Sequence, residues 1–148
     1  MSQTFRYFTP VKVRYNDTDR QGHVYFGQYY EYFDEGVDAY LQEIGYGYED
    51  MFKDDSDIVY AESHCNYKSS AKWPEILRVY TRIGHIGNRS LRFDFEIRAE
   101  SDDRLVTTGH MVTVTVNRQT FTPHPVPPKL RQAVATYEET DEFLVAKK

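Results

Sequence analysis

Residues 14–44 decide the fold, and they read RYNDTDRQGHVYFGQYYEYFDEGVDAYLQEI. Residues 16–22 within this stretch are of types that favour turns and helix caps. Behind them, apolar and aromatic residues recur at steps of three and four, which is typical of one face of a helix. The residues on this face are Tyr29, Phe33, Val37, Tyr40, Leu41 and Ile44. The stretch therefore predicts a polar turn followed by a long helix from about residue 26 to residue 44.

Three glycines bear on this helix. Gly36 lies inside it, where glycine costs about 1 kcal/mol relative to alanine. Two explanations are open for Gly36: a sheet that approaches the helix backbone closely, or a position exposed to solvent. Gly45 and Gly47 follow where the helix is expected to stop.

The rest of the chain alternates between apolar and polar residues with a period of two, as half-buried strands do. Strands are predicted at residues 11–15, 58–67, 77–84, 91–100 and 106–116. The connections at 87–89 and 101–104 are short, so the strands that they join should be antiparallel. Prolines between 123 and 128 exclude a further central strand, and Pro127 and Pro128 can open a short closing helix. This order predicts an α+β fold in which an antiparallel sheet packs on one long helix.

Length and composition set broad limits. A chain of 148 residues with no linker or repeat predicts a single domain over residues 1–148. The one cysteine, Cys65, fits a reducing compartment, and the N-terminus lacks the apolar core of a signal peptide. No stretch approaches the roughly 20 apolar residues of a membrane span. We therefore expect a cytoplasmic protein.

The net charge of −5 argues against a general nucleic-acid surface, because phosphate binding depends on clustered Lys and Arg. An open sheet leaves unpaired edges and an outer face, which favour association between copies. We therefore expect at least a homodimer.

The polar turn places Asp17 and Asp19 ahead of the long helix. Unpaired N–H groups and the helix dipole favour negative charge there. A carbonyl docked at that point would meet N–H donors, and a carboxylate could attack it or activate water against it. Aspartates in such turns also serve as simple caps, so the local pattern leaves both interpretations open.

A family resemblance bears on this choice. The pattern Tyr15-x-Asp17-Thr18-Asp19-x-x-Gly22-His23-Val24, followed by a tyrosine-rich helix, resembles the signature of the hotdog-fold acyl-CoA thioesterases, the 4-hydroxybenzoyl-CoA thioesterase-like family. The similarity continues in order through Tyr67, Pro74, the Asn88-Arg89-Ser90 turn, the valine-rich strand and the closing Pro-x-Pro segment. It covers essentially the whole chain.

The resemblance implies a hotdog fold, with an antiparallel sheet wrapped around one long central helix. It implies hydrolysis of an acyl-CoA thioester to a carboxylic acid and free CoA, with no cofactor besides the CoA of the substrate. By position, Asp19 matches the catalytic carboxylate, as nucleophile or general base, and Asp17 its structural companion. The backbone N–H of Phe26 or Gly27 would polarise the thioester carbonyl.

The same resemblance suggests how the acyl group binds. Tyr15 and Tyr25 would line the acyl pocket, and His23 would hold the loop or contact substrate. Phe26 departs from the pattern, because one branch of the family that acts on short acyl chains often has His there. The phenylalanine allows a larger or aromatic acyl group.

In this family the active site lies at a dimer interface, so the resemblance implies a homodimer or homotetramer. Asn88, Arg89, Lys68 and Lys72 would contact the phosphates of CoA. Each of the four fits equally well as an ordinary solvated surface residue.

Other functions remain open at this stage. The same fold could bind CoA or acyl-carrier protein without hydrolysis, or act as a hydratase or dehydratase. No two of the five histidines stand at helical i, i+4 spacing, so no metal site is expected. His110, on the valine-rich face of its strand, is expected to be a core residue.

Overall fold

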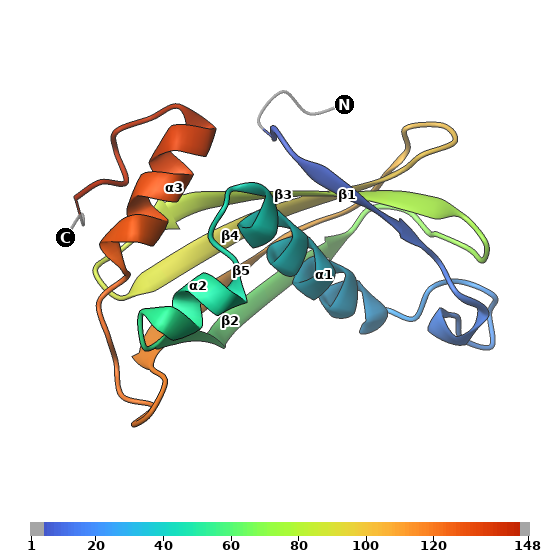
Figure 1. Cartoon of the computed structure of the whole chain (residues 1–148). Helices are drawn as coiled ribbons and strands as arrows, with labels where there is room; N and C mark the ends of the chain where they lie inside the picture. The colour runs from blue at the N-terminus through green and yellow to red at the C-terminus, as the bar shows by residue number, and fades with distance from the viewer. Residues whose placement is uncertain (1–4, 146–148) are drawn as a thin grey trace. The chain divides into compact units, whose positions relative to one another are not determined.

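The structure is a computed structural model that describes residues 5–145 (Figure 1). Its elements follow the predicted order of strand, long helix, four strands and closing helix. They are β1 (Phe8–Lys12), the 3-10 helix η1 (Tyr15–Asp17), α1 (Gln28–Glu43), α2 (Tyr48–Lys53), β2 (Ser56–Tyr67), β3 (Ile76–Ile86), β4 (Ser90–Ala99), β5 (Leu105–Asn117) and α3 (Pro128–Glu138).

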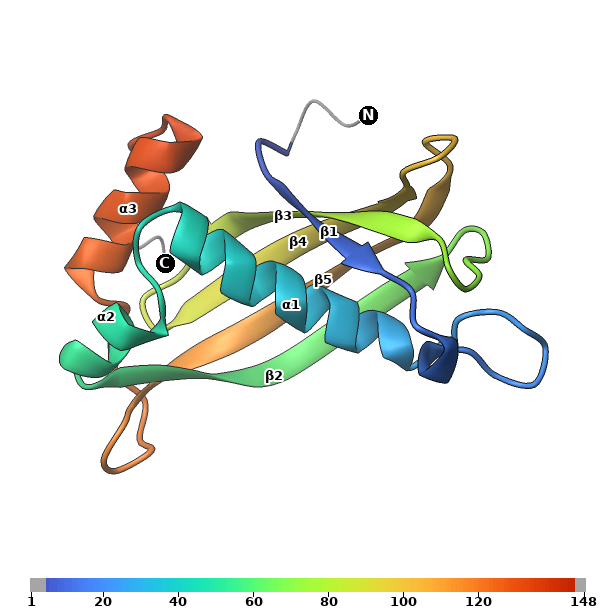
Figure 2. The same ribbon diagram turned by 45° about the vertical axis from the view of Figure 1, so that its right-hand side comes forward.

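The strands form one antiparallel sheet in the order β1-β3-β4-β5-β2 (Figure 2). β1 pairs with β3, with Phe8 opposite Tyr80 and Lys12 opposite Ile76. β1 and β2 are therefore the two edges of the sheet. The predicted α+β class is confirmed.

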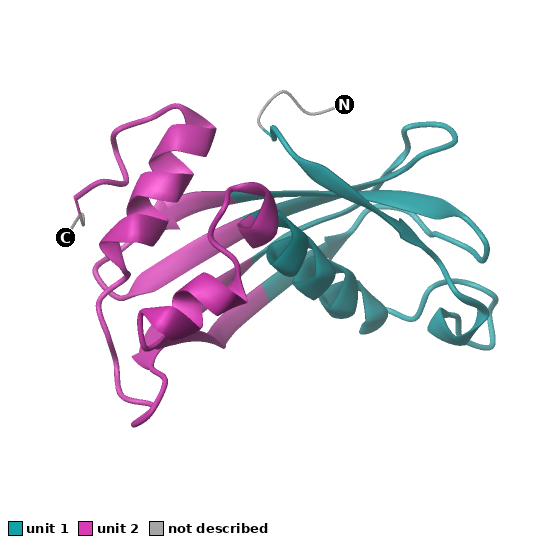
Figure 3. Ribbon diagram, in the orientation of Figure 1, with its two compact units in different colours: residues 1–40, 64–82, 94–110 teal, residues 41–63, 83–93, 111–148 magenta. Residues whose placement is uncertain are grey.

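The chain divides into two compact units (Figure 3). Unit 1 comprises residues 1–40, 64–82 and 94–110, and unit 2 comprises residues 41–63, 83–93 and 111–148. The helix α1 and the strands β2 to β5 each contribute residues to both units. A single domain over residues 1–148 stays a prediction.

In unit 1, α1 lies directly against the sheet. The ring of Phe33 stacks on the ring of Phe95 with 4.3 Å between centroids. A Cβ atom at Gly36 would collide with the Thr81 hydroxyl and lie 3.0 Å from a methyl group of Val79. Of the two explanations for Gly36, close approach of the sheet is therefore the correct one.

The helix α1 also ends as predicted. Gly45 has a φ of +86°, which glycine adopts without steric cost. Its N–H donates to the Gln42 carbonyl, and the Tyr46 N–H donates to the Leu41 carbonyl, so two of the last carbonyls of the helix are satisfied. The short helix α2 behind it was not predicted, because six residues are too few to repeat the helical period.

Two sequence predictions are corrected by the structure. The first strand ends at Lys12, three residues early, because the Arg14 N–H donates to the Asp17 carboxylate and turns the chain into η1. His110 is not a core residue. Gly109 faces the ring of Phe33, so its neighbour His110 points to the opposite face of β5, where it stacks on His64 at 5.2 Å.

Among the helices within residues 5–145, none combines the length and the apolarity needed to cross a membrane.

The close approach at Gly36 gives a stability prediction. Gly36→Ala should lower the free energy of unfolding by about 1–2 kcal/mol, because overpacking outweighs the roughly 1 kcal/mol that alanine gains in a helix. Urea denaturation measures this loss. Glu31→Ala, on the exposed face of the same helix, is the control and should change stability by less than about 0.5 kcal/mol. An alanine variant at Gly36 as stable as the parent would contradict the packing described.

Candidate functional site

The turn ahead of α1 is a small closed loop in unit 1. Thr18 and Val24 form an isolated antiparallel bridge, and the Asp19 N–H donates to the His23 carbonyl at 2.9 Å. Gly22 closes the tip with a φ of +81°, and its N–H donates to the Asp19 carbonyl. The loop therefore has a defined backbone conformation.

Asp17 fixes the base of this loop. Its carboxylate is buried, with 2% of the residue exposed, and accepts hydrogen bonds from the Arg14 N–H and the Tyr32 hydroxyl, both at 2.9 Å. The Arg14 guanidinium adds an ion pair at 3.1 Å. Burial by itself would raise the pKa of Asp17, but these hydrogen bonds and the guanidinium outweigh it and hold that pKa below its ordinary value. The predicted structural role for Asp17 agrees with these contacts.

Asp19 has a different environment. It is half-buried, and within residues 5–145 its carboxylate accepts a single hydrogen bond, from the Gln21 N–H at 2.9 Å, and forms no ion pair. This bond is a local turn contact of the kind that aspartate often makes. The second carboxylate oxygen of Asp19 is thus not used by the fold.

Backbone N–H donors lie where α1 begins. The Gln28 N–H donates to the Tyr25 carbonyl at 2.9 Å, and the Tyr30 N–H donates to the Gly27 carbonyl at 3.3 Å. The N–H groups of Phe26 and Gly27 find no acceptor within the described part of the chain. Helix starts with free N–H groups bind anions and polarise carbonyl oxygens.

The loop and the helix start are tied together through Asp17. The Tyr25 N–H donates to the Asp17 carbonyl at 2.9 Å, while the Asp17 carboxylate binds the Tyr32 hydroxyl of α1. The chain segment carrying Asp19 is thereby attached to the segment carrying the free donors.

Exposed aromatic rings form two groups, one at the start of α1 and one at η1. Tyr25 is 48% exposed and lies 4.6 Å from Phe26, which is 61% exposed and meets the edge of Tyr67 at 6.5 Å. Tyr15 pairs instead with Trp73 at 5.7 Å. We call these five rings the aromatic surface. Of the two predicted acyl-pocket residues, Tyr25 lies against Phe26, and Tyr15 belongs to the separate pair with Trp73.

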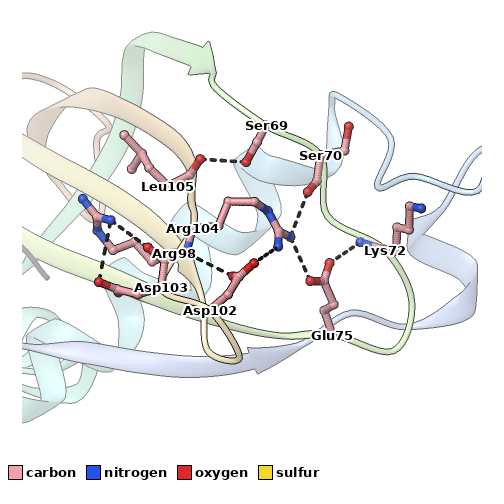
Figure 4. Close-up of polar contacts among 9 residues, drawn as sticks. All are labelled: Ser69, Ser70, Lys72, Glu75, Arg98, Asp102, Asp103, Arg104 and Leu105. Atoms are coloured by element: carbon pink, nitrogen blue, oxygen red, sulfur yellow. Dashed lines mark hydrogen bonds and ion pairs between the residues drawn. The ribbon is translucent and has the colours of Figure 1, made fainter.

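A polar network joins residues 70–75 to the turn between β4 and β5 (Figure 4). Arg104 donates to the carboxylates of Glu75 and Asp102, both at 2.8 Å, and to the Ser70 carbonyl at 3.0 Å. The other oxygen of Glu75 accepts the Lys72 N–H at 2.7 Å. The network holds residues 70–75 against the turn between β4 and β5.

This supported segment is the partner of the predicted loop. His23 and Lys72 form an isolated bridge, and the Val24 N–H donates to the Ala71 carbonyl at 2.9 Å. His23 therefore takes part in the loop through its backbone. Whether its side chain holds the loop or contacts substrate stays a prediction. Neither Glu75 nor Arg104 was predicted, because they are 29 residues apart in sequence and only the folded turn joins them.

The four residues predicted to contact CoA phosphates fall into two groups. Lys68 and Lys72 lie in unit 1, both exposed, in the connection after β2. Asn88 and Arg89 lie in unit 2, exposed in the turn between β3 and β4. Each pair thus lies within one connection of the chain. Their contact with phosphate stays a prediction.

The turn that carries Asn88 and Arg89 is anchored by the buried Arg131 of α3. Its guanidinium donates to the carbonyls of Gly87 and Asn88 and, at 3.0 Å, to that of Phe143. Burial lowers the pKa of Arg131. The turn is therefore held through its backbone, which leaves its exposed side chains available.

Within residues 5–145, no three His, Cys, Asp or Glu side chains come close enough together to hold a metal ion. The expectation of a metal-free site stays a prediction.

Comparison with known proteins identifies the family. The model of the thioesterase-like superfamily matches residues 13–134, which include the loop, α1 and the whole of β2 to β5. The chain belongs to this superfamily. Its fold is the hotdog fold predicted from the sequence.

Three relatives illustrate the family match. The DHNA-CoA thioesterase of Staphylococcus aureus is 27% identical, with a TM-score of 0.81 over 89% of this chain and 90% of that one. The PA5185 protein of Pseudomonas aeruginosa is 28% identical, with a TM-score of 0.81 over 90% and 92% of the two chains. The YsmA protein of Bacillus subtilis is 26% identical over 78% of this chain and 76% of its own length.

The contacts of Asp17 predict an acid-sensitive loss of stability. Asp17→Asn should lower the free energy of unfolding by about 2 kcal/mol at pH 7, because a buried carboxylate with charge-assisted hydrogen bonds is lost. The folded pKa lies below the ordinary value of 3.8, so this stability is present above that pH and disappears as pH falls through the folded pKa. The gap between parent and variant should therefore narrow below about pH 4.

Urea denaturation at pH 7 and at about pH 3 measures this gap. Asp19→Asn is the matched control, because the asparagine oxygen still accepts the Gln21 N–H, and it should stay within about 0.5 kcal/mol of the parent. A gap at Asp17 that is independent of pH would contradict the assignment.

Proposed function

We propose that this protein is an acyl-CoA thioesterase in which Asp19 is the catalytic carboxylate. The observation that carries the proposal is the contrast between the two loop aspartates. The carboxylate of Asp17 is buried and accepts hydrogen bonds from Arg14 and Tyr32. The carboxylate of Asp19 accepts one local hydrogen bond, and its second oxygen accepts none within residues 5–145. Membership in the thioesterase-like superfamily supports the same reaction.

The reaction follows from the two kinds of group that the loop joins. The thioester oxygen accepts the free N–H of Phe26 or Gly27, which stabilises the negative charge that develops on it. Asp19 attacks the carbonyl carbon or removes a proton from the attacking water. A C–O bond forms at the carbonyl carbon, the C–S bond breaks, and the sulfur takes up a proton and leaves as the thiol of CoA. Where Asp19 is the nucleophile, water then hydrolyses the acyl-aspartyl anhydride, which releases the carboxylic acid and restores the Asp19 carboxylate.

The aromatic surface favours a substrate with a flat acyl group. Its exposed rings, Tyr25 and Phe26 above all, offer faces and edges on which a planar aromatic group packs at favourable distances. The DHNA-CoA thioesterase of Staphylococcus aureus is named for a substrate of this kind. We propose an aromatic acyl-CoA as the preferred substrate, with Lys68, Lys72, Asn88 and Arg89 as candidate contacts to its phosphates.

The first test replaces Asp19. Asp19→Asn should lower kcat by about 10²–10⁴-fold, because it removes the nucleophile or general base while keeping the turn. Thiol release is followed on short, medium, long and aromatic acyl-CoA substrates, with Asp34→Asn on the exposed face of α1 as a matched control. Full turnover in the Asp19 variant would refute the mechanism. Binding of CoA with no hydrolysis of any substrate would favour a binding module instead.

We also propose that the protein works as a homodimer or homotetramer in the cytoplasm. The edge strand β2 is 12 residues long, and its residues 59–64 are all exposed. A long exposed edge strand offers unpaired backbone groups to a second copy. Residue Val59 lies on this strand and is 37% exposed.

A charge on this edge should disrupt assembly. By sedimentation, the parent should have at least twice the mass of the 17.5 kDa chain. Val59→Lys should lower the sedimenting mass toward that of a single chain, because lysine on an edge strand opposes strand pairing. Gln119→Lys, in the exposed turn after β5, adds the same charge and should leave the mass unchanged. A parent that sediments as a single chain would contradict the proposed assembly.

A further inference from the structure

Tyr67 makes a contact that the reaction described above does not use. It is the last residue of β2, and its hydroxyl donates to the backbone carbonyl of Phe26 at 3.2 Å. Its ring meets the ring of Phe26 edge to face, with 88° between the planes, and lies 5.7 Å from the ring of Tyr29. A side chain of the sheet edge is thus bound to the backbone at the start of α1.

The contacted carbonyl shares a peptide unit with a candidate donor. In a trans peptide the carbonyl of one residue and the N–H of the next lie in one plane and point in opposite directions. The bond from Tyr67 to the Phe26 carbonyl therefore fixes the direction of the Gly27 N–H. That N–H has no acceptor within residues 5–145.

The phenol is itself held in place by the sheet. Directly after Tyr67, the N–H groups of Lys68 and Ser69 both donate to the Val106 carbonyl, at 2.9 and 3.1 Å. The Ser69 hydroxyl adds a bond of 2.7 Å to the Leu105 carbonyl. The end of β2 is therefore attached to β5, and the hydroxyl of Tyr67 reaches the helix start from a fixed base.

The ring of Tyr25 packs against the same Phe26–Gly27 peptide and restricts its orientation. A Cβ atom at Gly27 would lie 2.8 Å from the ring of Tyr25, so that ring covers the glycine closely. The Phe26–Gly27 peptide has the Tyr67 hydroxyl on its carbonyl and the Tyr25 ring against its glycine. Its orientation is set by side chains as well as by the helix that follows.

We infer that Tyr67 is a positioning residue, whose hydroxyl directs the Gly27 N–H at the thioester oxygen of the substrate. This inference rests on the proposed function and assigns the oxyanion donor within it to Gly27. A hydrogen bond accepted by the carbonyl also polarises the peptide and strengthens its N–H as a donor.

The hydroxyl keeps its proton under all ordinary assay conditions. Desolvation, and after it the neighbouring Cys65 thiol, raises the pKa of Tyr67 to about 12. Tyr67 therefore remains a hydrogen-bond donor from acidic to mildly alkaline pH. Its contribution should not add a step to the pH profile of kcat in that range.

Tyr67→Phe is the decisive variant, because it removes the hydroxyl and keeps the ring. We expect kcat to fall roughly tenfold while KM stays within about twofold, since a misdirected donor weakens the transition state and not the bound substrate. Tyr46→Phe is the matched control: it deletes a hydroxyl that donates to Asp54 in unit 2 and should leave kcat unchanged. A Tyr67 variant that raises only KM would overturn the inference and make Tyr67 a wall of the acyl pocket.

A second readout does not depend on turnover. A CoA ketone that replaces the thioester sulfur by a methylene group cannot be hydrolysed, and its carbonyl stretching frequency reports the hydrogen bonds that the oxygen accepts. In the parent this frequency should lie below its value in water, and Tyr67→Phe should move it back toward that value. An equal frequency in both proteins would overturn the inference.

The two readouts separate the inference from the proposed function. If the parent hydrolyses no thioester, the proposed function fails, and the ketone frequency alone decides whether Tyr67 directs a donor. If the parent hydrolyses thioesters and Tyr67→Phe matches it in both kcat and frequency, the thioesterase stands and the role of Tyr67 fails.

Discussion

The buried carboxylate of Asp17 is the contact on which the site depends. It binds the backbone and guanidinium of Arg14 on one side and the hydroxyl of Tyr32 in α1 on the other. The backbone carbonyl of Asp17 accepts a hydrogen bond from the Tyr25 N–H at the far end of the loop. One residue therefore joins the end of β1, both ends of the loop and the flank of α1. Removing a carboxylate from water is costly, and three donors on one carboxylate are what offset that cost.

The position of Asp19 is a consequence of this arrangement. Asp19 makes one local side-chain hydrogen bond, so its place relative to the start of α1 is set by the loop backbone and not by its own contacts. That backbone is fixed at its base by Asp17 and along its far side by the segment that Glu75 and Arg104 support. Two aspartates, two residues apart, thus differ in their contacts, because the fold saturates only the carboxylate of Asp17. The proposed catalytic role of Asp19 rests on this difference.

Local patterns were enough to predict most of the fold. The three-to-four period of α1 and the alternation of β3, β4 and β5 depend on neighbouring residues, and all four elements lie close to the predicted bounds. The features that the sequence did not predict depend on contacts between residues far apart along the chain or on side-chain hydrogen bonds. The early end of β1 depends on the side chain of Asp17, and the outward direction of His110 depends on Gly109 meeting Phe33 of α1. The loop motif indicated Asp19, but the role of Tyr67 required the end of β2 to lie beside the helix start.

The contact of Tyr67 links the sheet edge to the chemistry of the loop. β2 is an edge strand whose central residues are exposed, and its last residue holds the peptide that carries the Gly27 N–H. An edge strand gains order when a second strand pairs with it, because its free backbone groups then find partners. Pairing of β2 with another copy would therefore stiffen the strand that ends at Tyr67. The proposed assembly and the proposed orientation of the oxyanion donor would then depend on the same strand.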